Sequence, residues 1–216
     1  MMELYKTVRN EAQAEQTIEK SRFITHVRPV SDRDEAEEFI ASVKKKYKDA
    51  THNVPAMVLG DKFQIQWASD DGEPQGTSGA PIVQMLVKEG ITNVVLVVTR
   101  YFGGIKLGTG GLVRAYTSSA KLGLEAAQIC SVREIFSVRA RIDYTFLAKL
   151  QNMADDKLDE AEDGPGFVIR DTEYSDKVVL TVWTLPEREE AFKSVLSNVT
   201  AGTAEVLGEE VLTEKA

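Results

Sequence analysis

The sequence predicts an α+β protein with two domains that meet near residue 135. Apolar residues at helical spacing alternate with short β-branched runs along the first part of the chain, and a βαββαβ order follows in the last part. The chain has 216 residues, of which 43% are hydrophobic and 28% charged, an ordinary globular composition. At about 100–150 residues per domain, this length fits one large domain or two small ones.

Several protein classes are excluded by composition. The longest unbroken aliphatic run, Val94–Val98, is too short to span a membrane. No apolar segment of the signal-peptide type follows Met1. The single cysteine, Cys130, cannot form an intramolecular disulfide and is typical of a reducing compartment. We therefore expect a soluble, cytoplasmic protein that needs no cofactor or metal ion.

Charge divides the chain into two unlike parts. Residues 1–137 carry 17 basic and 17 acidic residues, whereas residues 138–216 carry 9 basic and 17 acidic residues. The acidic second part would repel nucleic acid phosphates, and it could instead face a protein partner or orient the molecule on its target. In contrast, Gly90–Leu124 contains no acidic residue and includes Arg100, Lys106 and Arg114. This stretch predicts a local electropositive zone.

The first domain, 1–135, reads as alternating strands and helices. Asp32–Lys46 carries Ala36, Phe39, Ile40 and Val43 at helical spacing after a capping signal at Ser31. Pro81 suits the first turn of a helix that ends before Gly90, and another helix is expected from about Leu112 to Ala127. Strands are expected at Arg22–Val27, Asn53–Leu59, Phe63–Ala68 and Asn93–Thr99.

The second domain, 136–216, has a simpler order of strand and helix patterns. Strand patterns at 137–143, 167–174, 177–185 and 204–212 alternate with two helical patterns, and a turn is expected at Gly164–Gly166. The second helix opens at Pro186. The resulting βαββαβ order is the ferredoxin-like arrangement.

Five glycines between Gly103 and Gly111 form the main candidate site. The spacing of Gly103 and Gly108 matches a phosphate-binding P-loop, but Thr109 stands where that motif needs lysine. A dinucleotide fingerprint also fails, because Val113 replaces its third glycine. What remains is a glycine loop before a helix N-terminus, which suits an anion.

We therefore predict that this zone binds phosphate groups, with Tyr101 or Tyr116 able to stack on a base. The alternative is that the glycines only permit tight strand–helix packing. The predicted binding residues are Arg100, Tyr101, Gly103, Gly104, Lys106, Gly108, Gly110, Gly111, Arg114 and Tyr116.

A second candidate site combines His52 with the acidic loop residues Asp70, Asp71 and Glu73. Three carboxylates in four residues could hold a hard cation, but they could equally be a polar loop that caps the next helix. No complete set of nucleophile, base and oxyanion donor is visible, so we assign no catalytic residue and expect binding rather than catalysis.

Several of these motifs together resemble the IMPACT/YigZ family in its bacterial two-domain form. The segment Val98–Tyr116 is similar to the central signature of that family, and Lys20–Ile24, Ala50–Asn53 and Asp70–Gly79 fit as well. Many relatives carry a cysteine and then a tyrosine after the His-Asn pair, where this chain has Val54 and Met57. That departure argues against a thiol at this place and leaves the glycine loop unaffected.

The resemblance implies a first domain like domain IV of elongation factor G, of the β-α-β, ribosomal-protein-like type. It implies a ferredoxin-like second domain like the C-terminal domain of the same factor. It further implies regulation of translation through contact with RNA or the ribosome. Because the first fold is shared with small-molecule kinases, the alternative is an enzyme that binds a phosphate or nucleotide with the same loop.

Overall fold

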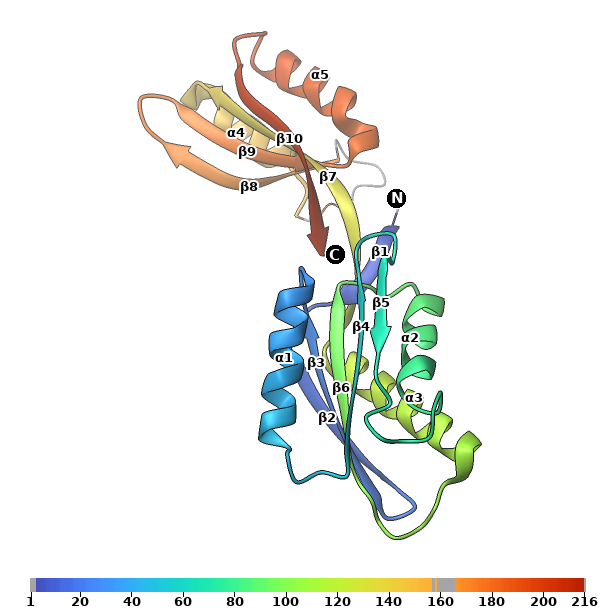
Figure 1. Cartoon of the computed structure of the whole chain (residues 1–216). Coiled ribbons are helices and arrows are strands. Elements are labelled where there is room, and N and C mark those ends of the chain that lie inside the picture. The colour runs from blue at the N-terminus through green and yellow to red at the C-terminus, as the bar shows by residue number, and fades with distance from the viewer. Residues whose placement is uncertain (1–2, 157, 159–165, 216) are drawn as a thin grey trace. The chain divides into compact units, whose positions relative to one another are not determined.

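The computed structural model describes residues 3–156, 158 and 166–215. These fall into two compact units: an N-terminal unit, mainly Leu4–Val132, and a C-terminal unit, mainly Arg133–Glu214 (Figure 1). Strand β7 (Ile129–Ile142) begins in the first unit and ends in the second. The domain boundary expected near residue 135 therefore lies within a continuous strand and not in a loop.

The N-terminal unit is built on an antiparallel sheet with the strand order β2-β3-β6-β4-β5. Its central strand, β6, is buried along nearly its whole length, as its β-branched sequence predicts. Thr25 of β3 pairs with Val98 of β6, and Val54 of β4 pairs with the same valine from the other side. The strands are β2 (Ala12–Ile18), β3 (Ser21–Pro29), β4 (His52–Leu59), β5 (Ile65–Ala68) and β6 (Val94–Tyr101).

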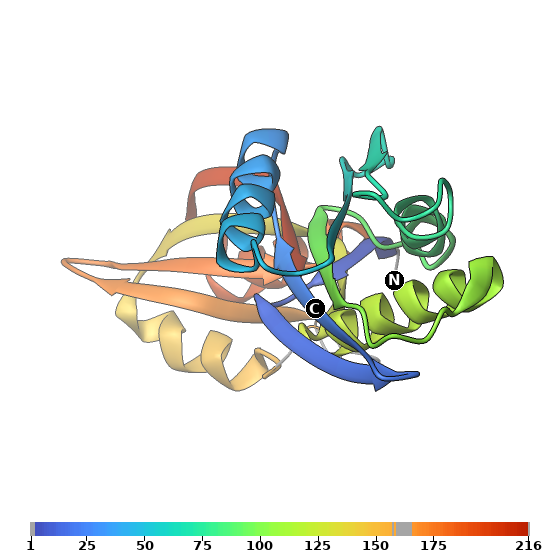
Figure 2. The same ribbon diagram turned by 60° about the horizontal axis from the view of Figure 1, so that its bottom comes forward.

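Helices cover both faces of this sheet. Helix α1 (Arg33–Lys46) packs on one face, where Val95 and Val97 of β6 meet Phe39. Helices α2 (Gly79–Lys88) and α3 (Gly108–Ala126) pack on the other face, against Leu96 and Val98. Figure 2 shows α1 on one side of β6 and the other two helices on the opposite side. Successive side chains of β6 point to opposite faces of the sheet and therefore belong to two separate apolar clusters.

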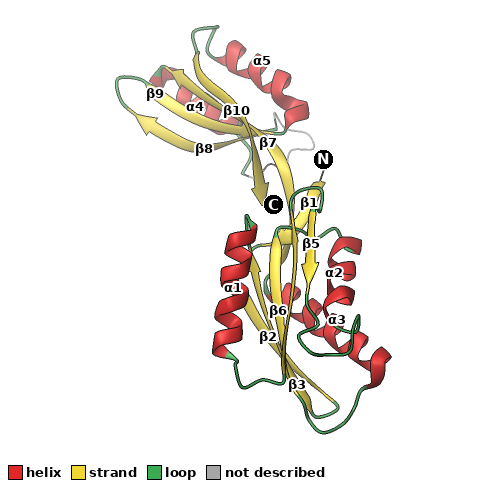
Figure 3. Cartoon of the chain, viewed as in Figure 1, coloured by secondary structure: helices red, strands yellow, loops and turns green. Residues whose placement is uncertain are grey.

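The C-terminal unit has the predicted βαββαβ order, and its strands are arranged β10-β7-β9-β8 (Figure 3). Leu150 of α4 and Phe192 and Leu196 of α5 pack with Val138 and Val182 in one apolar cluster. After β7 come α4 (Tyr144–Met153), β8 (Phe167–Tyr174), β9 (Val178–Thr184), a short 3-10 helix (Pro186–Arg188), α5 (Glu189–Val199) and β10 (Glu205–Lys215).

The α+β class is confirmed, but four local predictions need correction. The N-cap of α1 is Asp32, whose side chain accepts from the N–H of Glu35, and not Ser31. Strands β1 (Glu3–Val8) and β2 were not predicted, because β2 alternates small or polar residues and gives little hydrophobic signal. Helix α3 begins at Gly108 and not near Leu112, so several glycines lie in its first turn. Pro186 opens a 3-10 turn, and α5 follows it. The turn expected at Gly164–Gly166 lies outside the described residues except for Gly166.

Candidate functional site

The structure brings parts of the two candidate sites together in the interior of the N-terminal unit. Arg100 at the end of β6 donates from Nη1 to Oε1 of Glu73 over 2.7 Å. The hydroxyl of Tyr116 in α3 donates to the same oxygen over 2.7 Å. Arg100 also donates from Nη2 to Oγ of Ser21, which in turn accepts from the backbone N–H of Gly103. One buried network therefore joins β3, β6, α3 and the acidic loop.

This network corrects the expected role of two residues. Arg100 is only 4% exposed and Tyr116 is fully buried, so neither can touch a phosphate or a base at the surface. Burial and the hydrogen bond to Glu73 raise the pKa of the Tyr116 hydroxyl, which therefore stays protonated and acts as a donor. The segment Gly90–Leu124 contains no carboxylate, but in the folded protein Glu73 from another loop forms an ion pair with Arg100 of this segment.

The carboxylates of the acidic loop are also committed to internal partners. Asp70 accepts from the backbone N–H groups of Gly76 and Gly79 over 2.8 and 2.9 Å and so holds the start of α2. Burial opposes ionisation of Asp70, but the hydrogen bonds from Ser78, Gly76 and Gly79 keep its pKa below the ordinary value. Asp71 accepts from Asn53 N–H and from Lys44 Nζ, each over 2.6 Å.

His52 completes this internal network. Its Nδ1 lies 2.8 Å from the carbonyl oxygen of Asp71, and its Nε2 lies 3.7 Å from Oε1 of Glu73. Among the described residues, no group of three or more His, Cys, Asp or Glu side chains is arranged to hold a metal ion. The residues of the second candidate site do gather, and the contacts they make hold the loop in place.

The glycine loop docks against the turn between β2 and β3. A Cβ atom on Gly103 would lie 2.0 Å from the carbonyl oxygen of Lys20, so only glycine fits there. Gly104 and Gly108 have φ angles of +88° and +70°, in the left-handed region. The facing turn has positive φ at Glu19 and Lys20 as well. The glycine cluster therefore supplies the close approach and the positive φ angles expected from its sequence.

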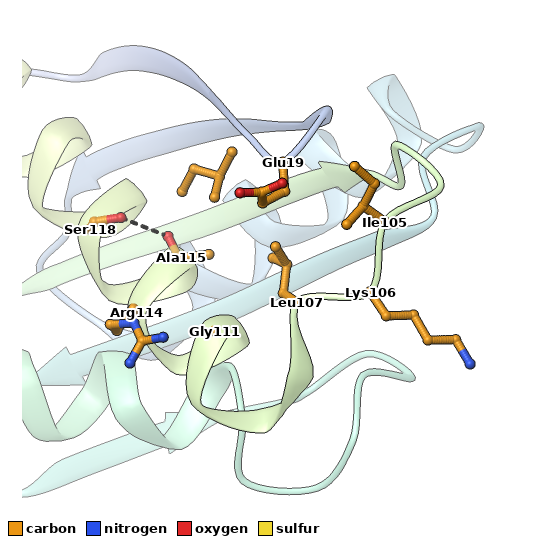
Figure 4. A pocket seen from close by; sticks show the side chains of 9 residues that line it. Glu19, Ile105, Lys106, Leu107, Gly111, Arg114, Ala115 and Ser118 are labelled. Atoms are coloured by element: carbon orange, nitrogen blue, oxygen red, sulfur yellow. Dashed lines mark hydrogen bonds between the residues drawn. The ribbon is translucent and has the colours of Figure 1, made fainter.

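Beside this loop lies a pocket of about 480 Å³. In Figure 4 the side chain of Leu107 lies between Lys106 on one side and Arg114 on the other, and the Lys106 side chain extends away from the other lining residues. Glu19 and Ile105 lie near each other on a further side. The lining residues are Ile18, Glu19, Ile105, Lys106, Leu107, Gly111, Arg114, Ala115 and Ser118.

The start of α3 contributes to the electrostatics of this pocket. Leu107 stands at the N-cap position without a side-chain hydrogen bond, and the first turn contains no acidic residue. The backbone N–H groups of that turn therefore have no side-chain acceptor and form the positive end of the helix dipole. Lys106 and Arg114 are exposed, and neither forms an ion pair within the described part of the chain.

The remaining predicted residue, Tyr101, lies apart from the pocket lining. Its hydroxyl donates to Asp49 over 3.1 Å, and the guanidinium of Arg22 lies 6.0 Å from its ring. Sequence reasoning missed the pocket walls from Ile18, Glu19 and Leu107. Ile105 and Leu107, on either side of Lys106, are apolar and could have indicated one wall of the pocket. No pattern in the sequence indicates that the β2–β3 turn lies beside them.

Comparisons with known proteins agree on one family. The model of the Impact N-terminal domain matches residues 19–124, and that of a domain of unknown function (DUF1949) matches residues 141–203. The chain is 39% identical to the IMPACT family member YvyE of Bacillus subtilis, over all of this chain and 96% of that protein. It is 46% identical to the IMPACT family member YigZ of Escherichia coli, over 46% of this chain and 50% of that protein.

A solved structure supports the fold. The crystal structure of a hypothetical protein, 29% identical in sequence, superposes with a TM-score of 0.57 over 96% of this chain and 98% of that one. None of the helices in the described part of the chain has the length and apolar character needed to span a membrane.

Proposed function

The protein belongs to the IMPACT family, and we propose that it acts in the regulation of translation by binding phosphates of RNA, free or in the ribosome, at its glycine loop. Lys106, Arg114 and the N–H groups at the start of α3 would make these contacts. Membership of the family agrees with the resemblance seen in the motifs, and the translational role is what that resemblance implies.

The positions of Lys106 and Arg114, which form no ion pair with another described residue, are the main support for this proposal. Lys106 and Arg114 lie at opposite ends of the pocket and do not converge on one point (Figure 4). A site for a single phosphate needs donors that converge, whereas successive phosphates of a polynucleotide are spread along a strand. The open, cationic ends of the pocket therefore support an extended polyanion more than a small phosphate ester.

The alternative is a small-molecule enzyme that binds a nucleotide or phosphate with the same loop. Its strongest support is the cluster of Glu73, His52 and Tyr116, which combines acid, base and hydroxyl groups. Glu73 and Tyr116 are buried at 8% and 0% exposure and face each other, so they are poorly placed to meet a substrate. The cluster supports a structural role better than a catalytic one.

The C-terminal unit carries the acidic excess of the chain and is a poor surface for phosphates. The RNA contact is therefore local to the glycine loop. The acidic unit remains available for a protein partner.

Binding of RNA and of small phosphates should be compared directly. We expect a single-stranded RNA oligonucleotide to bind the purified protein at about 50 mM salt, and Lys106→Ala or Arg114→Ala to weaken it. The control is Lys45→Ala, which removes one positive charge from an exposed position of α1 on the opposite face of the sheet. It should leave RNA binding unchanged. Thermal stabilisation by ATP or inorganic phosphate, without any RNA binding, would favour the enzyme alternative.

A further inference from the structure

The pocket beside the glycine loop contains a carboxylate that phosphate binding does not explain. Glu19 lines the same pocket as Lys106 and Arg114, and its negative charge repels phosphate. No ion pair or hydrogen bond joins the Glu19 side chain to another described residue. A carboxylate can only accept hydrogen bonds. Its position marks a place for a group that carries donors.

The part of the pocket wall beside Glu19 is apolar and can contact the flat face of an aromatic ring. Ile18, Ile105 and Leu107 line it beside Glu19, and Ile105 is 37% exposed. A volume of about 480 Å³ falls within the usual range of about 300–1,000 Å³ for small-ligand sites. A polynucleotide crossing this surface between Lys106 and Arg114 would bring an unpaired base to these apolar side chains.

We infer that the pocket receives an unpaired guanine, with the Glu19 carboxylate accepting from its N1–H and N2 amino groups. This inference rests on the proposed RNA binding. Guanine offers two adjacent donors on its Watson–Crick edge, which match the two oxygens of a carboxylate. Adenine and cytosine each place an acceptor beside their amino group, and uracil flanks its N3–H with two carbonyl oxygens, so each would set an acceptor against Glu19.

The structure holds the Glu19 backbone in a defined place. Ile18 and Ser21 pair across the end of the hairpin, so Glu19 and Lys20 form a tight turn with φ angles of +47° and +63°. The carbonyl of Lys20 lies directly against Gly103, which fixes this turn to the glycine loop. The backbone that carries Glu19 and the apolar wall of the loop are thus in place before any ligand arrives, and only the Glu19 side chain must be ordered on binding.

The experiment measures the affinity of oligouridylate carrying one central guanosine, inosine or adenosine, and of oligouridylate alone. The wild type should bind the guanosine oligomer at least about fivefold more tightly than the others, the low end for a bidentate contact. Inosine lacks only the N2 amino group and tests that donor directly. Glu19→Gln should abolish the guanosine preference, since an amide presents one acceptor and one donor, while binding to oligouridylate persists.

Glu38→Gln is the matched control, because it removes an exposed carboxylate from α1 on the other face of the sheet. It should keep the full guanosine preference. Equal binding of all four oligomers, with Lys106 still required, would overturn the guanine inference and leave the proposed function standing. A preference for guanosine that survives Glu19→Gln would also overturn it. If the wild type bound none of these RNA oligomers, both the guanine inference and the proposed RNA binding would be contradicted.

Discussion

Arg100 and Glu73 form an ion pair inside the N-terminal unit, with side chains that are 5% and 4% exposed. The guanidinium also packs against the rings of Phe23 and Phe102, with centroids 5.4 Å away. The sequence predicted Arg100 as a surface ligand because its neighbours along the chain lack carboxylates. Its true partner lies on another loop, and contacts between distant segments leave no trace in local composition.

Replacing Glu73 by Gln should strongly destabilise the fold. The change leaves the buried Arg100 charge without its counterion, a loss of about 3–5 kcal/mol for buried pairs. Glu89→Gln is the control: it breaks the ion pair with Lys121, whose side chain is half exposed, and should cost less than about 1 kcal/mol. Urea unfolding of both variants measures the difference. Equal, small losses would show that the buried pair does not support the fold.

His26 gives the N-terminal unit a pH dependence of defined sign. Burial, with a contribution from nearby Lys46, lowers its pKa from the ordinary 6.5 to about 4. Below pH 6.5 the unfolded chain binds a proton that the folded chain does not, so the free energy of unfolding falls from pH 6.5 to about 4. The loss approaches about 1.4 kcal/mol per pH unit at most.

His26→Phe tests this assignment by removing the titrating group. Urea unfolding midpoints between pH 7 and 4.5 should decline less steeply in the variant than in the wild type. Other groups titrate equally in both proteins, so the difference in slope reports His26. Parallel curves would show that burial does not hold this imidazole neutral.

At the scale of elements, the glycine loop was predicted better than the helix that follows it. The sequence indicated that the glycines serve positive φ angles or close approach, and Gly103, Gly104 and Gly108 do so. The start of α3 was misplaced because glycine is a poor helix former, so its first turn gave no helical signal. The position of the β2–β3 turn beside the glycine loop was missed, because no local pattern in the sequence indicates that Lys20 lies against Gly103.

Gly103→Ala should destabilise the protein, because its Cβ would lie 2.0 Å from the carbonyl oxygen of Lys20 and force the turn and the loop apart. We expect a loss above about 1 kcal/mol and weaker RNA binding. Gly110→Ala is the control within the same motif. Only the tip of Arg114 lies within 4 Å of its Cβ, so it should be neutral or stabilising by up to about 1 kcal/mol. Thermal unfolding of both variants distinguishes these outcomes.

At the scale of the whole molecule, the sequence predicted the class, the family and the order of the second half. These features depend on periodicity and long motifs, which local sequence carries well. The family is confirmed by a relative that matches the full chain. The strand order and the buried network depend on contacts between distant segments, and only the structure reveals them. The division into domains and the phosphate-binding residues stay predictions.

The apolar clusters of the N-terminal unit share no residue with those of the C-terminal unit, which predicts two unfolding events. Leu96 belongs to the core of the N-terminal unit, and Leu180 belongs to that of the C-terminal unit. Each Leu→Ala change should cost about 2–5 kcal/mol and move only the transition of its own unit. Denaturant unfolding followed by Trp67 and Trp183 fluorescence, one tryptophan in each unit, measures both transitions. A single transition shifted by either variant would contradict independent domains.

The most direct test of the proposed RNA contact is the salt dependence of RNA affinity for the wild type and for the Lys106→Ala/Arg114→Ala double variant. The logarithm of affinity falls linearly with the logarithm of salt concentration, with a slope set by the number of phosphates neutralised. If both side chains bind phosphates, the double variant should lose about 1.4 units of slope on single-stranded RNA and bind more weakly at low salt. An unchanged slope, or a wild type without salt-sensitive RNA binding, would contradict the proposal.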